Sequence, residues 1–291
     1  MKKGRPGTHV GVQRRALGLG HPPAAIMIDP GLKGRLVLIT GANNPHGIGA
    51  AIARGFARQG SKVFLHFFRR KDIPTKREAD SKATVPGDSF YYRQQTKSAD
   101  EVLGEIRALG AKAYASEVDF SDASLIPWLF DQAEGLLGPV GVMVNNAAYW
   151  EADTFVPPGA ESTNRLVELW TDRPASITAG SFDRLFAVNT RAPALMMGEF
   201  VRRHIRREAR WGRIINLSTG GAERFPCEVT YGASKYALES YTRSAAVELG
   251  NFGITVNVVS LGPVQTGWIT SELEREILPS IPLGRIVTPK M

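Results

Sequence analysis

Short apolar runs rich in β-branched residues alternate with helical segments from Arg35 to Val259. This alternation predicts parallel strands covered by helices, because the chain between two parallel strands must cross over, usually through a helix. Six strands are expected, at residues 35–40, 62–67, 112–118, 141–145, 213–218 and 255–259. Right-handed crossovers would then build one doubly wound α/β sheet, the Rossmann fold, with the strand order 3-2-1-4-5-6.

Helices are expected between these strands, near residues 47–59, 98–109, 122–137, 181–207 and 230–250. Two proline-containing stretches, 69–97 and 149–180, interrupt the alternation. We interpret both as insertions on the surface, the first as a loop and the second as a loop with a short helix at 162–170. Both follow the carboxyl ends of strands, where ligands bind in open α/β sheets, so each is a candidate border of the substrate site.

The length of 291 residues and the apolar content of 43% suit one large domain, which we place at 31–291. Residues 1–30 are rich in Gly, Pro and Arg and lack periodicity, which predicts a disordered basic extension. An organelle-targeting segment, or an upstream start before Met27, are alternatives for it. Half of the net charge of +8 lies in this extension.

The remaining charge is accompanied by no zinc-ligand spacing, RNA-binding signature or basic groove-reading helix, so nucleic acid is not expected as a partner. The sequence holds neither a secretory apolar run nor the ~20 apolar residues of a membrane span. Its single cysteine, Cys227, cannot form an internal disulfide. These features predict a cytoplasmic protein with no metal site and no membrane contact.

The glycine-rich segment 40–49 follows the first expected strand and opens an Ala-rich helix. Glycines permit a tight turn and a close approach of the backbone to a pyrophosphate, whose charge then faces the amides of the helix N-terminus. This context predicts a dinucleotide site. The expected contacts lie in this segment and after the third and fourth strands, at Gly41, Asn43, Gly47, Ile48, Gly49, Asp119, Phe120, Asn146 and Ala147.

Dinucleotide folds often carry an acid at the end of the second strand, where it binds the ribose 2′-hydroxyl. Here this place holds Arg69 and Arg70 and no carboxylate. An arginine suits a 2′-phosphate through charge-assisted hydrogen bonds, so Arg69 predicts NADP(H), with NAD(H) remaining possible. The alternative is that both arginines only solvate a loop.

Tyr231 and Lys235 are spaced to lie one helical turn apart on the same face. Ser218 ends the fifth strand and Asn189 lies in the helix before it, so all four gather at the same end of the sheet. Reduction of a ketone adds a hydride to carbon and a proton to oxygen. A phenol near an ammonium and a positive nicotinamide can supply that proton, because both charges lower its pKa.

These residues resemble the short-chain dehydrogenase/reductase family, and in pattern its 3-oxoacyl-acyl-carrier-protein reductases, over residues 33–285. The resemblance implies that Tyr231 is the general acid and base and that Lys235 also binds the nicotinamide ribose. It implies that Ser218 orients the carbonyl and that Asn189 holds a water. Segment 262–266 resembles the part that meets the carboxamide, which indicates Val264 and Thr266.

The chain departs from the family at its end, because Met291 comes where a further helix and a seventh strand are usual. We therefore expect a C-terminally truncated member whose sixth strand is an exposed sheet edge. A homodimer would pair through the helices at 181–207 and 230–250. The glycine segment also carries two residues more than the family pattern, and Ala148 replaces a glycine.

The leading hypothesis is an oxidoreductase that transfers a hydride between NADP(H) and a small-molecule ketone or secondary alcohol. An enoyl-thioester reductase is one alternative, because the lengthened glycine segment is similar to that group, although its tyrosine and lysine lie further apart. A truncated NADP-binding protein without turnover is the other. Phe225, Cys227 and residues 149–180 are expected to border the pocket, and they do not identify the substrate.

Overall fold

The computed structural model describes residues 29–70, 84–157, 160 and 175–289. The chain divides into two units, Met1–Gly31 and Leu32–Met291, and the fold described below is that of the second. The expected extension, up to residue 28, and the expected helix at 162–170 lie outside the described residues.

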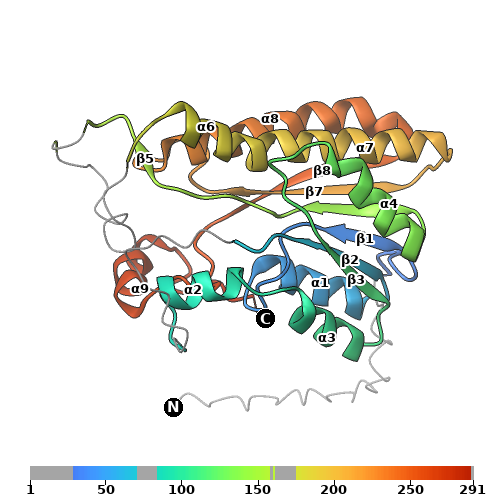
Figure 1. The fold of residues 1–291 in the computed structure, drawn as a ribbon, viewed down its shortest axis with the longest axis horizontal. Coiled ribbons are helices and arrows are strands. Elements are labelled where there is room, and N and C mark those ends of the chain that lie inside the picture. The colour runs from blue at the N-terminus through green and yellow to red at the C-terminus, as the bar shows by residue number, and fades with distance from the viewer. Residues whose placement is uncertain (1–28, 71–83, 158–159, 161–174, 290–291) are drawn as a thin grey trace, which may run out of the picture. The chain divides into compact units, whose positions relative to one another are not determined.

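The second unit is built on a parallel sheet of six strands in the order β3-β2-β1-β4-β7-β8 (Figure 1). The strands are β1 (Leu36–Ile39), β2 (Lys62–Phe67), β3 (Ala113–Glu117), β4 (Val140–Asn145), β7 (Gly212–Thr219) and β8 (Ile254–Leu261). This confirms the predicted doubly wound fold, strand for strand. Two short strands, β5 (Asp153–Thr154) and β6 (Ala175–Ser176), pair separately from the sheet.

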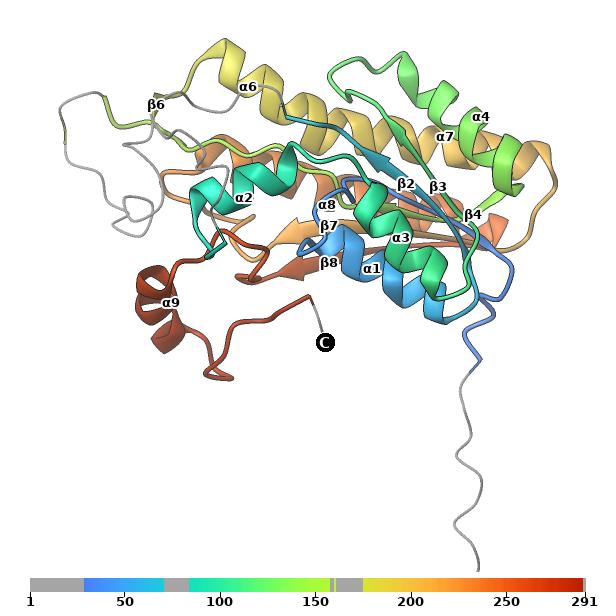
Figure 2. The ribbon, with the colours of Figure 1, turned by 60° about the horizontal axis from the view of Figure 1, so that its bottom comes forward.

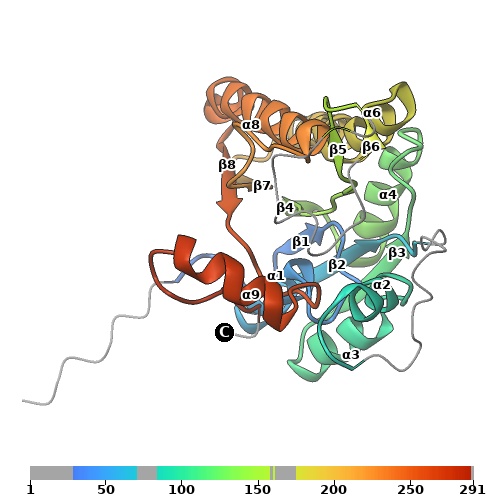
Figure 3. The ribbon, with the colours of Figure 1, turned by 90° about the vertical axis from the view of Figure 1, so that its left-hand side faces the viewer.

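Helices cover both faces of the sheet (Figure 3). On one face α1 (Ile48–Arg58) and α3 (Asp100–Ala108) lie side by side (Figure 2). On the other face lie α4 (Leu125–Leu137), α7 (Ala192–Arg206) and α8 (Val229–Leu249). Helix α1 turns Ala50, Ala53 and Ala57 toward the strands, and these small side chains let the helix pack close to the sheet.

The long helix expected at 181–207 is divided in the structure. It consists of α6 (Ala179–Phe186), a π-helical turn (Ala187–Arg191) and α7. Pro193 explains the interruption, because it has no N–H to donate to the carbonyl of Asn189 four residues earlier. The expected helix is therefore present over 179–206 with a π-helical turn in its middle, and Asn189 lies in that turn.

The insertion at 69–97 is not only a loop, because it contains helix α2 (Asp88–Gln95). Phe90 and Gln94 of this helix are buried, and the Phe90 ring meets the ring of His46 edge to face at 5.2 Å. The N–H of Gly87 bonds the carbonyl of Gly267 at 2.9 Å. Helix α2 therefore packs against the glycine-rich turn and against the segment after β8, and the prediction of a surface loop is wrong for these residues.

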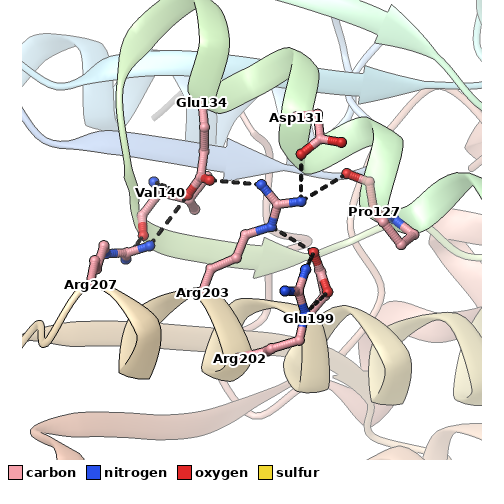
Figure 4. A network of polar contacts seen from close by, with 8 residues as sticks. All are labelled: Pro127, Asp131, Glu134, Val140, Glu199, Arg202, Arg203 and Arg207. Carbon is pink, nitrogen blue, oxygen red and sulfur yellow. Dashed lines mark hydrogen bonds and ion pairs between the residues drawn. The ribbon is translucent and has the colours of Figure 1, made fainter.

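A buried ion-pair network joins α4 to α7 (Figure 4). The guanidinium of Arg203 is only 6% exposed and contacts the carboxylates of Asp131, Glu134 and Glu199 at 2.6–2.8 Å. Arg207 adds a contact to Glu134 at 3.3 Å. Such a network fixes the two helices relative to each other, and breaking it would leave buried charges unpaired.

Strand β8 forms one edge of the sheet, and among the described residues no further strand pairs with it. Beyond β8 the chain forms α9 (Ser271–Ile277), which packs with Ile269 and Ile286 in a small apolar cluster of its own. Val264 and Val287 make a single parallel bridge there. Within the described part of the chain, every helix is too short or too polar to cross a bilayer.

Candidate active site

The glycine-rich turn is fixed to the end of β4 by a cluster of hydrogen bonds. The hydroxyl oxygen of Thr40 accepts the backbone N–H groups of Asn146 and Ala147, each at 2.9 Å. The Asn146 amide donates in return to the carbonyls of Thr40 and Gly41 at 2.9 and 2.8 Å. The structure thus brings the two predicted cofactor-contacting segments together, and Asn146 acts as their link.

Gly41 and Gly49 allow the chain segments of this turn to lie unusually close. A Cβ at Gly41 would stand 2.7 Å from the Cα of Ala147, and Gly41 has a φ of +70°. A Cβ at Gly49 would stand 2.5 Å from the carbonyl oxygen of Gly41. Gly47 precedes α1 without capping it by a side chain, and Ile48 begins the helix, so the first amides of α1 remain available to an anion.

His66 supports the turn from β2, which the sequence interpretation missed. Its Nδ1 accepts the N–H of Gly41 at 3.2 Å, and its Nε2 donates to the carbonyl of Val118 at 2.9 Å. Burial lowers the pKa of His66 to about 4, so the ring is neutral at pH 7 and can accept at Nδ1. The ring stacks on Phe120 at 3.9 Å. A histidine inside an apolar strand was the available signal.

Asn43 and Asn44 tie the turn to neighbouring segments. The Asn43 amide donates to the carbonyls of Gln95 and Lys97 at 3.2 and 2.9 Å, and the Asn44 amide donates to the carbonyl of Thr266 at 3.0 Å. The structure therefore places the expected carboxamide segment beside the glycine-rich turn. The side-chain nitrogen of Asn43 is therefore already bonded within the protein.

Val264 and Thr266 lie in a compact turn after β8 and are nearly buried, with 8% and 9% exposed. The N–H of Thr266 bonds the carbonyl of Val264 at 2.9 Å, and the indole of Trp268 donates to the same carbonyl at 3.1 Å. These contacts fix the segment from which both residues were expected to reach a nicotinamide.

Arg69 is paired with a carboxylate in the structure. Its guanidinium contacts both oxygens of Glu117, at the end of β3, at 2.6–3.1 Å. The Arg69 side chain is 51% exposed. Asp119, two residues further, bonds the N–H of Ser121 at 2.8 Å. Arg69 thus lies beside the loop that was expected to meet the adenosine, with Glu117 as its present partner.

Arg70 lies between two tyrosines. Its guanidinium is 5.3 Å from the ring of Tyr92 on α2 and 5.4 Å from the ring of Tyr149, which follows β4. These are cation–π distances. The insertion and the end of β4 therefore meet at Arg70.

Tyr231 and Lys235 lie on the first two turns of α8, as expected. The Lys235 ammonium is 6.0 Å from the centre of the Tyr231 ring and donates to the carbonyl of Leu217 at 3.0 Å. Burial lowers the pKa of Lys235 to about 8. The pKa of Tyr231 is raised by burial and then by Glu228 and Tyr91. The expectation that the protein lowers the Tyr231 pKa is wrong for the protein's own groups, because desolvation of the phenolate dominates.

Asn189 is fully buried and holds two segments beside this helix. Its amide oxygen accepts the N–H of Tyr149 at 2.8 Å, and its amide nitrogen donates to the carbonyl of Tyr149 at 2.8 Å and to the hydroxyl of Ser234 at 3.0 Å. Ser234 precedes Lys235. The π-helical turn therefore positions the end of β4 against the turn of α8 that carries Tyr231 and Lys235.

Ser218 lies against α8 at a different level from Tyr231. Its hydroxyl donates to Glu239 at 2.8 Å, and it is only 7% exposed. Glu239 follows Lys235 by one helical turn and also binds Arg243 at 2.9 Å. Ser218 thus lies at the contact between β7 and α8, where Glu239 accepts its hydroxyl proton.

Two buried acids beside Tyr231 were missed by the sequence interpretation. Glu228, just before α8, accepts a hydrogen bond from the indole N–H of Trp150, and Asp153 accepts the N–H of Thr230 at 2.9 Å. Burial, together with Asp153, raises the pKa of Glu228 to about 7. No described residue bonds the buried Oδ2 of Asp153. The only sequence signal was an acid three positions before the tyrosine.

The described residues contain no group of three His, Cys, Asp or Glu side chains arranged to hold a metal ion.

Comparison with known proteins places this arrangement in a family. The short chain dehydrogenase family matches residues 83–276. The uncharacterized oxidoreductase YjdA of Bacillus subtilis (strain 168) is 31% identical over 88% of this chain and 85% of its own length. Versicolorin reductase stcU of Emericella nidulans is 29% identical over 86% of this chain and 76% of its own length.

Solved structures agree with these sequence relatives. The crystal structure of a dehydrogenase/reductase from Sinorhizobium meliloti 1021 has a TM-score of 0.65 and 27% identity, over 89% of this chain and 84% of that chain. With a parallel sheet in the order β3-β2-β1-β4-β7-β8 and these matches, the chain belongs to the short-chain dehydrogenase/reductase family of oxidoreductases.

Proposed function

We propose that the protein interconverts a ketone and a secondary alcohol with NADP(H) as the hydride carrier. The proposal rests mainly on Tyr231 and Lys235. They lie one helical turn apart on α8, and the Lys235 ammonium is 6.0 Å from the centre of the Tyr231 ring. The N-terminus of α8 lies at the same end of the sheet as the glycine-rich turn. A phenol beside a fixed ammonium is suited to proton transfer. Family membership implies a nicotinamide cofactor for it.

The residues of the turn fit a dinucleotide. Any Cβ at Gly41 or Gly49 would collide with backbone, at 2.7 and 2.5 Å, so both glycines keep the turn narrow beneath the uncapped N-terminus of α1. A pyrophosphate would be held by the amides there, with Ile48 in the first helical position. The cofactor supplies the hydride to the carbonyl carbon.

Tyr231 would then donate its phenolic proton to the carbonyl oxygen. Lowering the pKa of a free phenol from about 10 to near 7 requires about 4 kcal/mol of favourable charge interaction, and the burial of Tyr231 adds to this requirement because it disfavours the phenolate. Lys235, whose pKa is about 8, remains mostly protonated at pH 7 and supplies part of that interaction from its position on the carbonyl of Leu217. Asn189 holds the adjoining turn through Ser234.

The preference for NADP(H) over NAD(H) is supported by Arg69, whose half-exposed guanidinium ends the second strand. A 2′-phosphate could displace the Glu117 carboxylate from the Arg69 guanidinium, or share the guanidinium with it, because a dianion binds guanidinium more strongly than a single carboxylate charge does. Arg70 stands next to it with no carboxylate partner among the described residues. Arg69 lies at the end of β3 through its contact with Glu117, and Arg70 lies beside Tyr92 and Tyr149.

A homodimer through α7 and α8 is supported by large apolar side chains that these helices leave exposed. They are Leu195, Ile205, Tyr236, Tyr241 and Val247. Contiguous exposed apolar side chains mark interaction surfaces. Size-exclusion chromatography with light scattering tests this proposal: a dimer that becomes a monomer in Tyr241→Lys supports it, and a monomeric wild type contradicts it.

The reductase proposal is tested by following NADPH absorbance with three ketones, ethyl acetoacetate, cyclohexanone and 1-tetralone, and with one enoyl thioester, crotonyl-CoA. Oxidation with a ketone supports the proposal. Oxidation with crotonyl-CoA alone would establish an enoyl reductase instead. NADPH binding, seen by nicotinamide fluorescence, with turnover of none of the four compounds would favour a binding protein without turnover.

A further inference from the structure

The phenol of Tyr231 has an acid before it and a cation after it along the chain. Glu228 is the N-cap of α8 and comes three positions before Tyr231, and Lys235 comes one helical turn after it. The N-cap side chain and the third helical residue are neighbours, which is the geometry of the capping box. The start of α8 therefore brings a carboxyl group close to the phenol, opposite in charge to the ammonium.

Glu228 is held in place by segments outside α8. Its side chain makes no capping bond to the helix, and its carboxylate instead accepts the indole N–H of Trp150, which follows β4. Its backbone pairs with that of Asp153 in β5. Cys227, directly before it, has a φ of +66°, which residues other than glycine rarely adopt unless the surrounding structure requires it. These contacts fix Glu228 in the interior, where it is only 5% exposed.

The other titratable groups that face this pair among the described residues are Asp153, Tyr91 and Lys235. Burial, and then Asp153, raise the pKa of Glu228 to about 7, so its carboxyl is mostly neutral at pH 6 and mostly ionised at pH 8. Burial first, and then Glu228 and Tyr91, raise the pKa of Tyr231. Lys235, 6.0 Å from the centre of the Tyr231 ring, supplies the opposing positive charge.

We propose that the Glu228 carboxylate opposes Lys235 and holds the Tyr231 phenol in its protonated form, and so sets the pH range in which Tyr231 exchanges a proton with the substrate. Glu228 is a positioning residue that acts through Tyr231 and transfers no proton itself. This assignment rests on the proposed interconversion of a ketone and an alcohol. Because the charge of Glu228 develops between pH 6 and pH 8, its effect on the reaction must develop over the same interval.

Oxidation of the alcohol shows this effect, because it requires the phenolate of Tyr231. The phenolate takes the proton of the alcohol hydroxyl, the carbon–oxygen double bond forms, and the hydride passes from the same carbon to NADP⁺, which becomes NADPH. A negative charge on Glu228 disfavours the phenolate. If this charge raises the pKa of Tyr231 by about one unit, ionisation of Glu228 lowers the fraction of phenolate by up to ~10-fold.

The test compares wild type with Glu228→Gln, which keeps the shape of the side chain and an acceptor for Trp150 but carries no charge. The measured quantity is kcat/KM for NADP⁺-dependent oxidation of the alcohol that corresponds to whichever of the three ketones reacts fastest. We expect the ratio of variant to wild type to be about 1 at pH 6 and ~5 at pH 8, given a Glu228 pKa of about 7. Glu223→Gln, an exposed residue of the same loop, should stay within ~2-fold of wild type at both values.

A ratio for Glu228→Gln that rises less than about threefold between pH 6 and pH 8 overturns the assignment, because a purely structural role would change kcat/KM by the same factor at both values. An equal rise in Glu223→Gln overturns it as well. Should Glu228→Gln not fold, Glu228→Ala, which also lacks the charge, takes its place with the same threshold.

If wild type turns over none of the ketones and alcohols, the reductase proposal fails, and the ionisation of Tyr231 is then observed directly. Protein that contains tyrosine labelled with ¹³C at Cζ is titrated in the presence of NADP⁺, and the NMR signal of Tyr231 is assigned by its loss in Tyr231→Phe. A larger ionised fraction of Tyr231 at pH 9 in Glu228→Gln than in wild type supports the role of Glu228. Equal fractions overturn it.

Discussion

The Nδ1 atom of His66 accepts the backbone N–H of Gly41 at 3.2 Å, so the second strand holds the glycine-rich turn directly. The same ring is buried, stacked on Phe120, and neutral at pH 7 because burial lowers its pKa to about 4. His66 thus adds to the hydrogen bonds by which Thr40 and Asn146 fix the glycine-rich turn to the end of β4.

His66→Phe should therefore weaken NADPH binding. Phenylalanine keeps the apolar volume and the stacking partner but leaves the N–H of Gly41 without its acceptor, which typically costs about 1–3 kcal/mol when the group is buried. We expect NADPH affinity to fall ~5- to 100-fold in a fluorescence titration, with a small loss in Tm. His66→Gln, which retains an acceptor, is the matched variant. Equal affinity of wild type and His66→Phe would show that the turn does not need this bond.

Glu228→Gln should stabilise the protein above neutral pH. Burial raises the pKa of Glu228 from 4.5 to about 7, so the folded state holds its proton more tightly than the unfolded chain does. The cost of ionisation is therefore absent below pH ~4.5, grows as the pH rises to ~7 and is complete above it. It amounts to about 1–3 kcal/mol, and the neutral glutamine avoids it.

Chemical denaturation of wild type and Glu228→Gln at pH 5 and pH 8 measures this difference. The free energy of unfolding of Glu228→Gln should be close to that of wild type at pH 5 and larger than that of wild type at pH 8. Glu223→Gln, an exposed residue of the same loop, should change stability by less than about 0.5 kcal/mol at both values. A stability difference for Glu228→Gln that stays constant between the two pH values would contradict a raised pKa.

Arg203→Met should destabilise the fold strongly. It removes the buried cation shared by Asp131, Glu134 and Glu199, and it leaves Glu134 with Arg207 and Glu199 with Arg202 as remaining partners (Figure 4). Because this compensation is partial, we expect a loss of about 2–3 kcal/mol in the free energy of unfolding, which is less than for a buried pair left with no partner. Arg202→Met is the control, because Arg202 is 53% exposed and contacts only Glu199 of these acids, so about 0–1 kcal/mol is expected. If both variants lost the same free energy of unfolding in urea denaturation, burial would not determine how much these ion pairs contribute to stability.

The strands and their order could be predicted from the sequence because the central strands are short apolar runs of the length that a two-sided parallel sheet requires, separated by helical segments. Leu36–Ile39 is fully buried, and its neighbours β2 and β4 are nearly so. The spacing of Tyr231 and Lys235 likewise depends only on helix geometry. Local pattern was sufficient for both.

The remaining features depend on contacts between distant residues, which a local pattern does not contain. Helix α2 is short and polar, and its position depends on Phe90 meeting His46 and Gly267. The hydrogen bond of Ser218 depends on where α8 places Glu239. The raised pKa of Glu228 depends first on its burial and then on Asp153, and both depend on segments that are distant in the sequence. Each required the folded chain.

Arg69→Ala should reduce the preference for NADPH over NADH. If Arg69 binds a 2′-phosphate, the ratio of kcat/KM for the two cofactors should fall ~10-fold or more, because charge-assisted hydrogen bonds contribute about 1.5–3 kcal/mol. Glu117→Gln should raise the same ratio, since it removes the carboxylate that competes for Arg69 at 2.6 Å. An unchanged ratio in both variants would assign Arg69 and Glu117 to a surface ion pair without a cofactor role.

The most direct measurement of the central claim is ketone-dependent NADPH oxidation by Tyr231→Phe, alongside NADPH affinity. The phenylalanine ring keeps the packing against Phe225 and removes only the proton that would be transferred. We predict that kcat falls by ~10²–10⁴ while NADPH affinity stays within ~3-fold, and that Tyr236→Phe, on the exposed side of the same helix, remains fully active. Undiminished turnover by Tyr231→Phe would show that this phenol is not the proton donor.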